Sequence, residues 1–310
     1  MNNRNKHSKK RFKPSKTLSG VLLMLLHAIS MSFIYTIVKK LSKDLHPNQI
    51  TFLYKFTVLI FIVPWCIIGG FGRNLRTNKL GLHVARGTFS VMGSLCFFYS
   101  ISKLQLVEAA VITKLEQVVV VLIGIFYFKE KFTHAKFIMI TFCLLGVLLV
   151  MKPGFEPFNK NYIFIFLAIM FWAANNFTIK VLGKTERTKA QIFYVMLISS
   201  ILSFPLALAN WIPISIKNFG YIVILGVCTI IHLAAFFRAY KLADISLVMP
   251  FDYTRLVFTG ILGYFIFNEA PDPWSLFGYA LIILGGIYLI CNETRKKGFS
   301  REAEESKLNN

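Results

Sequence analysis

Residues 124–146 read GIFYFKEKFTHAKFIMITFCLLG, and residues 263–285 read GYFIFNEAPDPWSLFGYALIILG. The two stretches align without a gap at an offset of 139 residues, which places Glu130 on Glu269. Chance similarity is the alternative explanation, because Phe, Leu and Gly are common in this chain. Paired glutamates at equivalent positions favour a true internal repeat, which divides the chain into two similar halves.

The chain is too apolar for a soluble domain. Of its 310 residues, 55% are hydrophobic and 16% are charged, and the mean hydropathy is +0.60. The net charge of +21 raises the alternative of a nucleic-acid-binding protein. However, the Lys and Arg residues lie in the two ends and in short breaks between long apolar runs, instead of on one face of a polar domain. The composition therefore predicts an integral membrane protein whose surroundings are a lipid bilayer, with no nucleic-acid partner.

Ten apolar runs approach or reach the roughly 20 residues that a helix needs to cross a bilayer. An even number of spans places both ends of the chain on one side. Lys and Arg are more numerous in the loops on that side, 11 against 7, which predicts that both termini are cytoplasmic. The predicted spans cover residues 17–38, 49–70, 81–101, 106–128, 134–151, 161–181, 190–212, 219–240, 245–267 and 274–293.

The repeat contains five spans, and this odd number means that the second copy enters the membrane from the opposite side. We therefore predict an all-α membrane protein with ten transmembrane helices in two inverted five-helix repeats around a central cavity. Repeats of this kind let the two halves of a transporter rock about a central site. The predicted organisation is a basic disordered tail at 1–16, a first repeat at 17–151, a second repeat at 161–293 and a polar tail at 294–310.

The sequence lacks the motifs of the main competing classes. It contains no GxxxxGK[ST] for nucleotide hydrolysis and no HExxH or nucleophile motif for a membrane enzyme. Its five cysteines stand singly, with no metal-ligand spacing. We expect no enzymatic activity, no catalytic residues, no cofactor and no metal.

A pattern of small-residue helix, apolar helix ending in Phe-x-x-Glu, short turn and glycine-spaced helix occurs at 109–151 and again at 248–290. This pattern resembles the EamA-type branch of the drug/metabolite transporter superfamily, over residues 17 to 293. The resemblance implies a ten-helix bundle in a bacterial inner membrane. It also implies a central cavity lined by helices one to four and six to nine, with the fifth and tenth helices at the periphery.

Two shorter motifs refine the resemblance. His83-x-x-Arg86-Gly87 and the stretch at 264–272, YFIFNEAPD, are most similar to the S-adenosylmethionine uptake transporters of intracellular bacteria. Both motifs lie at helix ends and not in the expected cavity. The fourth span departs from the family pattern, because it carries Lys114, Glu116 and Gln117 where relatives are usually apolar with a proline.

Ionisable side chains near the bilayer centre are functional candidates, since each costs on the order of 3 kcal/mol on insertion scales. Glu116 and Arg255 are 139 residues apart, so the inverted repeat places them at equivalent depths, where we expect them to pair across the cavity. Asp252 and Arg255 are three residues apart and share a helix face, an arrangement that lets Arg255 bridge both acids. The alternative is a set of buried salt bridges that only hold the helices in register.

The functional interpretation gives these ions a substrate. Lys55, Lys114 and Arg255 suit a carboxylate or phosphate, while Glu116 or Asp252 suits an amine or a coupled proton. His27 and His232 could relay protons, but a backbone hydrogen bond is the commoner role, and neither is counted as a site residue. The polar and aromatic residues predicted to complete the cavity are Tyr54, Gln117, Trp172, Asn175, Asn176 and Tyr253.

These features predict a secondary transporter for a small metabolite, S-adenosylmethionine or another zwitterionic or anionic compound. Its expected partners are that substrate and a coupling proton or counter-substrate. An exporter of amino acids or drug-like compounds is one alternative. A channel or assembly protein that does not transport by a binding site is the alternative from another class.

Overall fold

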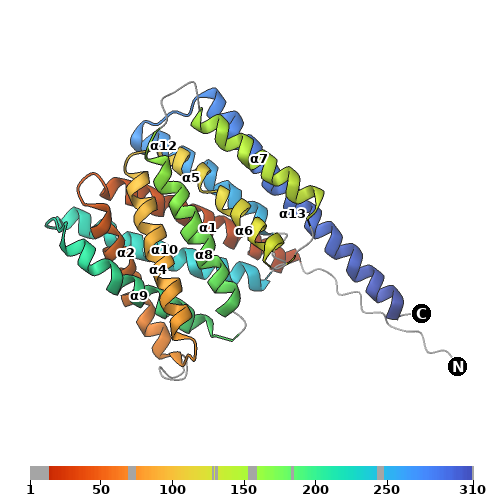
Figure 1. Ribbon diagram of the computed structural model, residues 1–310, viewed down its shortest axis with the longest axis horizontal. Helices are drawn as coiled ribbons and strands as arrows, with labels where there is room; N and C mark the ends of the chain where they lie inside the picture. Colours follow the sequence, from red (N-terminus) through yellow and green to blue (C-terminus); the bar gives the residue numbers. More distant parts are fainter. Residues whose placement is uncertain are drawn as a thin grey trace.

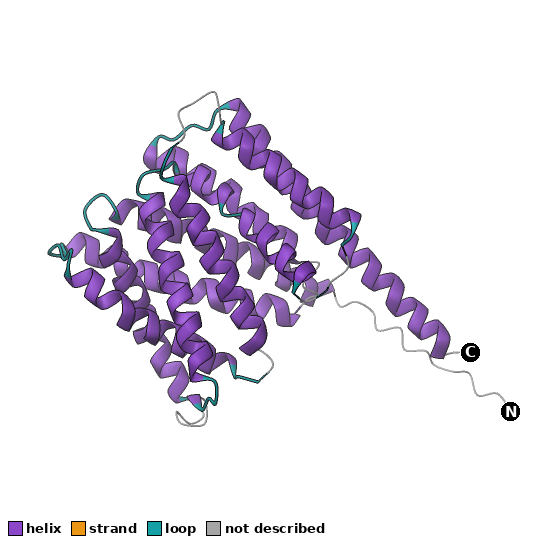
Figure 2. Cartoon of the chain, in the orientation of Figure 1, coloured by secondary structure: helices purple, strands orange, loops and turns teal. Residues whose placement is uncertain are grey.

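The computed structural model describes residues 14–68, 75–127, 129, 132–152, 159–182, 185–242 and 248–308. Within these ranges the regular structure is helical throughout and contains no strand (Figure 2). In chain order the helices are α1 (Pro14–Leu41), α2 (Pro47–Ile67), α4 (Leu80–Ile101), α5 (Leu106–Ile112), α6 (Leu115–Phe126), α7 (His134–Met151), α8 (Tyr162–Leu182), α9 (Thr188–Leu208), α10 (Ile216–Leu242), the short 3₁₀ helix η1 (Met249–Tyr253), α12 (Thr254–Phe267) and α13 (Pro273–Leu308).

Nine segments of the described chain are long and apolar enough to cross a membrane, with α5 and α6 together forming one of them. The remaining predicted span, the ninth at 245–267, corresponds to η1 followed by α12. The predicted all-α architecture with ten spans is therefore confirmed. The first span is longer than expected, since α1 runs to Leu41 and includes Lys39, which hydropathy alone assigns to a loop.

Helices α2 and α9 show the repeat most plainly. Each has 21 residues, and their first residues, last residues and internal prolines, Pro64 and Pro205, are all 141 positions apart. A proline inside a helix removes one backbone hydrogen bond and favours a bend. The two halves therefore share the position of a helix-internal proline as well as the order of their helices.

The halves interlock, because α1 of the first half packs along α10 of the second, and α4 packs along α8 in the equivalent way. Helices α7 and α13 lie side by side along one flank of the bundle (Figure 1). Their backbones approach closely at Gly146 and Gly278. A Cβ added to Gly278 would lie 2.5 Å from the carbonyl oxygen of Gly146, so only glycine fits this contact.

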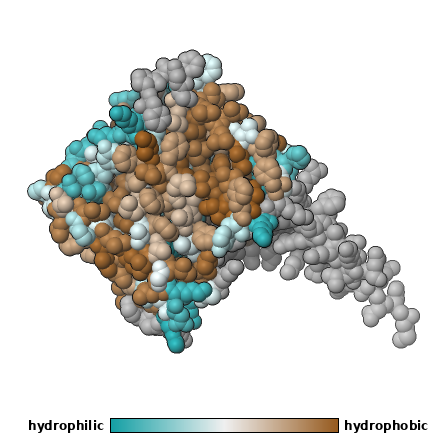
Figure 3. Space-filling model, viewed as in Figure 1, coloured by the Kyte–Doolittle hydropathy of each residue, from teal (hydrophilic) through white to brown (hydrophobic). Residues whose placement is uncertain are grey.

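The visible face of the bundle is mostly apolar, and hydrophilic side chains gather near its ends (Figure 3). Large side chains such as Phe126 and Phe265 are 79% and 75% exposed. Contiguous exposed apolar surface of this kind is unfavourable in water and favourable in lipid. The chain is thus a multi-pass membrane protein.

The start of α1 and the end of α13 lie at the same end of the bundle (Figure 1). Residues 1–13, most of the predicted basic tail, are outside the described residues. Within the predicted polar tail at 294–310, α13 continues as one helix to Leu308. Glu, Lys, Arg and Ala dominate this segment, and these residues have favourable helix propensities.

Candidate functional site

Neither the fourth nor the ninth span is one continuous α-helix. In the fourth span the break lies at Thr113 and Lys114, between α5 and α6. In the ninth it lies at Tyr253, where η1 passes into α12. Lys114 and Tyr253 are 139 positions apart, and their φ, ψ angles are nearly equal, −66°, −17° and −68°, −21°.

Local chemistry explains the breaks. Pro250 is the second residue of η1 and has no backbone N–H to continue a helical ladder. The Thr113 hydroxyl donates to the backbone oxygen of Ala110 at 2.7 Å, and the Lys114 N–H donates to the oxygen of Val111 at 2.9 Å, which tightens this turn. Irregular backbone is tolerated at membrane depth where protein or a cavity surrounds it, and transporter sites are commonly built at such breaks.

Three basic side chains converge on Asp252 at these breaks. Lys114 Nζ donates to Asp252 Oδ2 at 2.8 Å, and a terminal nitrogen of Arg255 lies 3.6 Å from the same oxygen. His27 Nε2 from α1 is 3.3 Å from Oδ1. The Lys114 side chain is 1% exposed, whereas those of Asp252 and Arg255 are 14% and 13% exposed. The cluster is thus deeply buried but remains partly accessible through its acid and its arginine.

The second acid of the site is Glu116. Its Oε1 accepts a hydrogen bond from Asn176 Nδ2 of α8 at 2.6 Å. The predicted pairing of Glu116 with Arg255 is not seen among the described residues, whereas the predicted contact of Arg255 with Asp252 is present at 3.6 Å. Arg255 and Lys114 still act on Glu116 electrostatically. The two acids therefore occupy separate positions around one cationic centre.

Aromatic side chains cover this centre. The ring of Tyr35 lies 5.7 Å from the guanidinium carbon of Arg255, and the ring of Tyr253 lies 4.7 Å from Lys114 Nζ. The Tyr253 hydroxyl donates to Gln117 Oε1. Cation–π contacts of this kind stabilise a desolvated charge by about 2 kcal/mol.

Two polar atoms of this cluster, Asp252 Oδ1 and Arg255 Nε, are buried without a hydrogen-bond partner, and Asn175 Oδ1, next to Asn176 on α8, is a third such atom. His27 approaches Asp252 Oδ1 but is not placed for a full hydrogen bond. Buried polar atoms without partners are rare in folded proteins and call for an explanation. Two of these atoms accept hydrogen bonds and one donates, so a ligand that carries both an amine and an acid would satisfy them.

The remaining predicted residues lie apart from this cluster. Lys55 Nζ of α2 donates to Ser90 Oγ of α4 at 3.0 Å and lies 5.0 Å from the Tyr54 ring centre. Trp172 packs onto α4 at Gly93, where an added Cβ would come within 2.5 Å of the indole. Lys55, Tyr54 and Trp172 thus border the α4 side of the bundle instead of contacting Asp252.

A second set of contacts connects the two halves at the end of the bundle opposite the termini. Glu269, which follows α12, forms an ion pair with Lys39 of α1 and accepts a hydrogen bond from the Leu106 backbone N–H at 2.6 Å. Lys39 also donates to the Leu104 oxygen at 2.6 Å. Glu130, the repeat partner of Glu269, lies outside the described residues. These contacts hold α1, α5 and the end of α12 together.

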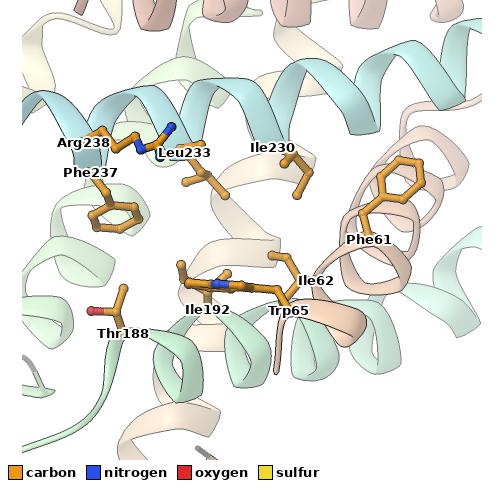
Figure 4. Close-up of a pocket in the computed structure, with 10 residues that line it drawn as sticks. Phe61, Ile62, Trp65, Thr188, Ile192, Ile230, Leu233, Phe237 and Arg238 are labelled. Atoms are coloured by element: carbon orange, nitrogen blue, oxygen red, sulfur yellow. The ribbon is translucent and has the colours of Figure 1, made fainter. Parts of the chain in front are cut away.

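A cavity of about 500 Å³ opens between α2, α9 and α10 (Figure 4). Figure 4 shows Phe237 pointing from α10 toward Thr188 of α9, while the Arg238 side chain lies along α10. It lies beside the last turns of α2 and α10 and the first turn of α9, and none of the predicted site residues lines it. The predicted central cavity is therefore not the one found here. Arg238 of α10 is the charged residue among those that line this cavity.

His27 and Tyr35 both contribute to the ionic cluster, and neither was predicted as a site residue. Tyr35 could not be singled out from the sequence because aromatic residues are so common in this chain. A polar residue in an otherwise apolar span is a signal for His27, but the helix face that it occupies is set by the packing of α1 on α10.

Comparisons with known proteins agree with this architecture. The profile of the EamA-like transporter family matches residues 18–152 and 159–291. An S-adenosylmethionine uptake transporter of Rickettsia prowazekii is 24% identical, over 93% of this chain and 97% of its own length. A pseudopaline exporter of Pseudomonas aeruginosa is 23% identical, over 87% of this chain and 95% of its own length.

A riboflavin transporter of Vibrio cholerae is also 23% identical, over 90% of this chain and 95% of its own length. One solved crystal structure superposes with a TM-score of 0.63 at 17% identity, covering 91% of this chain and 98% of the other. At that identity the superposition supports the fold alone.

Proposed function

The chain belongs to the EamA-like transporter family and is a small-metabolite transporter, and from its site we propose that it carries S-adenosylmethionine or a zwitterionic metabolite of similar chemistry. The observation that carries this proposal is the buried arrangement of Lys114 and Arg255 beside Asp252, with Glu116 as a second acid. A site with two cations and two separated acids suits a ligand that has charges of both signs.

S-adenosylmethionine has an amino-acid head, a sulfonium centre and an adenine ring. Its carboxylate suits Arg255 Nε, which is buried without a partner, and Lys114 beside it. Its ammonium suits the unpartnered Oδ1 of Asp252. The sulfonium and the ring suit Glu116 and the face of Tyr35, since onium groups bind carboxylates and aromatic faces. Asn175 Oδ1 is an acceptor for an amine of the base.

Relatives support the substrate class. In four Rickettsia species the relatives named S-adenosylmethionine uptake transporter are 24–26% identical to this chain over 93% of its length. Other relatives carry pseudopaline or riboflavin. All three names describe polar metabolites of moderate size, which fits a polar buried site better than an apolar drug pocket.

We further propose that the protein lies in a bacterial inner membrane with both termini in the cytoplasm, because Lys and Arg are more numerous in the loops on the side of the termini. With that orientation the contact of Lys39 with Glu269 closes the outer end, and the cavity at Arg238 lies on the cytoplasmic side. In alternating access, one state of the transporter is closed at the outer side and open at the cytoplasmic side, which matches this arrangement. Transport leaves the substrate chemically unchanged.

Uptake into proteoliposomes tests the proposal. Purified protein is reconstituted and given labelled S-adenosylmethionine with or without excess unlabelled S-adenosylmethionine, riboflavin or single amino acids. We expect saturable uptake that unlabelled S-adenosylmethionine suppresses more strongly than the other compounds. Stronger competition by amino acids would overturn the substrate, and linear flux without competition would indicate a channel and overturn transport by a binding site.

A further inference from the structure

The cavity between α2, α9 and α10, of about 500 Å³, is separate from the ionic cluster around Asp252 (Figure 4). Ile230 and Ala234 of α10 line it, whereas His232 between them contacts His27 of α1. Residues two positions apart on a helix point to nearly opposite sides, because each residue turns the helix by about 100°. Helix α10 therefore stands between the cavity and the ionic cluster, and a molecule bound in the cavity is a ligand other than the substrate held at Asp252.

The walls of the cavity change from polar to apolar with depth. Thr188, the first residue of α9, and Arg238, near the end of α10, line it at the helix ends on the side of the termini. Apolar side chains such as Phe61 and Ile230 line it deeper in the bundle. Ile230 is eight residues from Arg238, or about 12 Å along the helix axis. One leaflet of hydrocarbon is about 15 Å thick, so the cavity matches the polar end and much of the tail of an amphiphile.

The polar end of the cavity is positively charged. Arg238 is exposed and forms no ion pair or hydrogen bond within the part of the chain that the structure describes. A second cation, Lys189, lies 5.1 Å from the ring centre of Trp65 and donates to the Ile68 backbone oxygen at 2.8 Å. Glu186, an acid at the same end, is 6% exposed and faces α4 instead. The described residues that line the cavity include no Asp or Glu, so its entrance lacks an anion.

This combination selects the chemistry of the ligand. Arginine binds phosphate through paired N–H donors, and basic pockets between transmembrane helices bind anionic lipid headgroups. A polar metabolite would leave its hydrogen-bonding groups unpaired against the apolar depth, which is costly. We infer that the cavity binds an anionic phospholipid, with the phosphate at Arg238 and one acyl chain between α9 and α10. This lipid site is independent of which substrate the ionic cluster carries.

Quenching of Trp65 fluorescence by lipids with brominated acyl chains measures occupancy, because Trp65 lines the cavity. The protein is reconstituted in vesicles that contain brominated phosphatidylglycerol, which is anionic, or brominated phosphatidylcholine, which is zwitterionic. The quenching in Trp65→Phe is subtracted to remove the contribution of the other tryptophans. We expect phosphatidylglycerol to bind about fivefold more tightly than phosphatidylcholine, the preference that one basic side chain gives at an anionic lipid surface.

Three variants locate the site. Arg238→Gln should make the binding of the two lipids equal, and the exposed position of Arg238 should leave the fold intact. The matched control Arg76→Gln replaces an exposed arginine between α2 and α4, outside the cavity, and should keep the fivefold preference. Ala234→Phe fills the cavity and should weaken the quenching by both lipids.

Equal binding of the two lipids to the wild type, or a preference that survives Arg238→Gln, would overturn the lipid site. Quenching that Ala234→Phe leaves unchanged would place the lipid outside the cavity and overturn it as well. Relief of the quenching by S-adenosylmethionine or by inorganic phosphate would assign the cavity to a soluble ligand, which also contradicts a phospholipid. None of these outcomes changes the assignment of the substrate, because the measurement requires no transport.

Discussion

Asp252→Asn removes the carboxylate on which Lys114, Arg255 and His27 converge. Lys114 is 1% exposed, so it cannot turn to water when its partner is lost. Removing one partner of a buried ion pair destabilises a protein by about 3–5 kcal/mol. At about 2 °C per kcal/mol for a chain of this length, the melting temperature should fall by about 6–10 °C.

Thermal unfolding of the purified protein measures this change, and Asp44→Asn serves as the control because Asp44 is an exposed acid in the turn after α1. The control should stay within about 0.5 kcal/mol of the wild type. The double variant Lys114→Met with Asp252→Asn removes both charges and should recover more than half of the lost stability.

Transport by the double variant then separates structure from function. If the pair only holds the helices in register, uptake should return with the stability. If Lys114 and Asp252 contact the substrate, uptake should stay at least tenfold below the wild type although the protein is stable. An Asp252→Asn variant with the same melting temperature as the wild type would refute the convergence of charges on this carboxylate.

The remaining predictions concern three other contacts. Glu116→Gln keeps the contact with Asn176 as a neutral hydrogen bond. It should reduce uptake at least tenfold with little change in melting temperature. Uptake equal to that of the wild type would show that Glu116 does not contribute to substrate binding. Gly278→Val places a side chain against the backbone of Gly146 and should lower stability by about 1–3 kcal/mol in thermal unfolding, whereas an unchanged melting temperature would exclude the close α7–α13 contact. Glu269→Gln leaves Lys39 without its anion and should destabilise the chain by about 3 kcal/mol. Adding Lys39→Met to this variant should restore most of the lost stability. A double variant whose loss of stability equals the sum of the two single losses would contradict the ion pair.

The arrangement of the spans was predictable because the bilayer imposes it. Apolar runs of fixed length and a repeat at an offset of 139 residues define ten helices in two inverted halves. The charged candidates were predictable for the same reason, since Lys114, Glu116, Asp252 and Arg255 are costly in an apolar helix unless they have partners.

The pairing of these charges could not be predicted, because it depends on helix rotation and on the breaks at Lys114 and Tyr253. Equal depth suggested Glu116 and Arg255 as partners, yet the break turns Lys114 toward Asp252 and leaves Glu116 to Asn176. Lys39 was missed because hydropathy ends a span at the first charges, whereas the helix continues through them to reach Glu269. Where a helix ends within a charged stretch depends on its tertiary contacts, which the sequence does not show.

The most direct test of the central claim is equilibrium binding of labelled S-adenosylmethionine to the purified protein, compared with Glu116→Gln and with the control Asp44→Asn. We predict saturable binding of one substrate per chain, unchanged in the control and weakened at least tenfold in Glu116→Gln. No saturable binding to the wild type, or equal affinity in all three proteins, would contradict a substrate site at the breaks in the fourth and ninth spans.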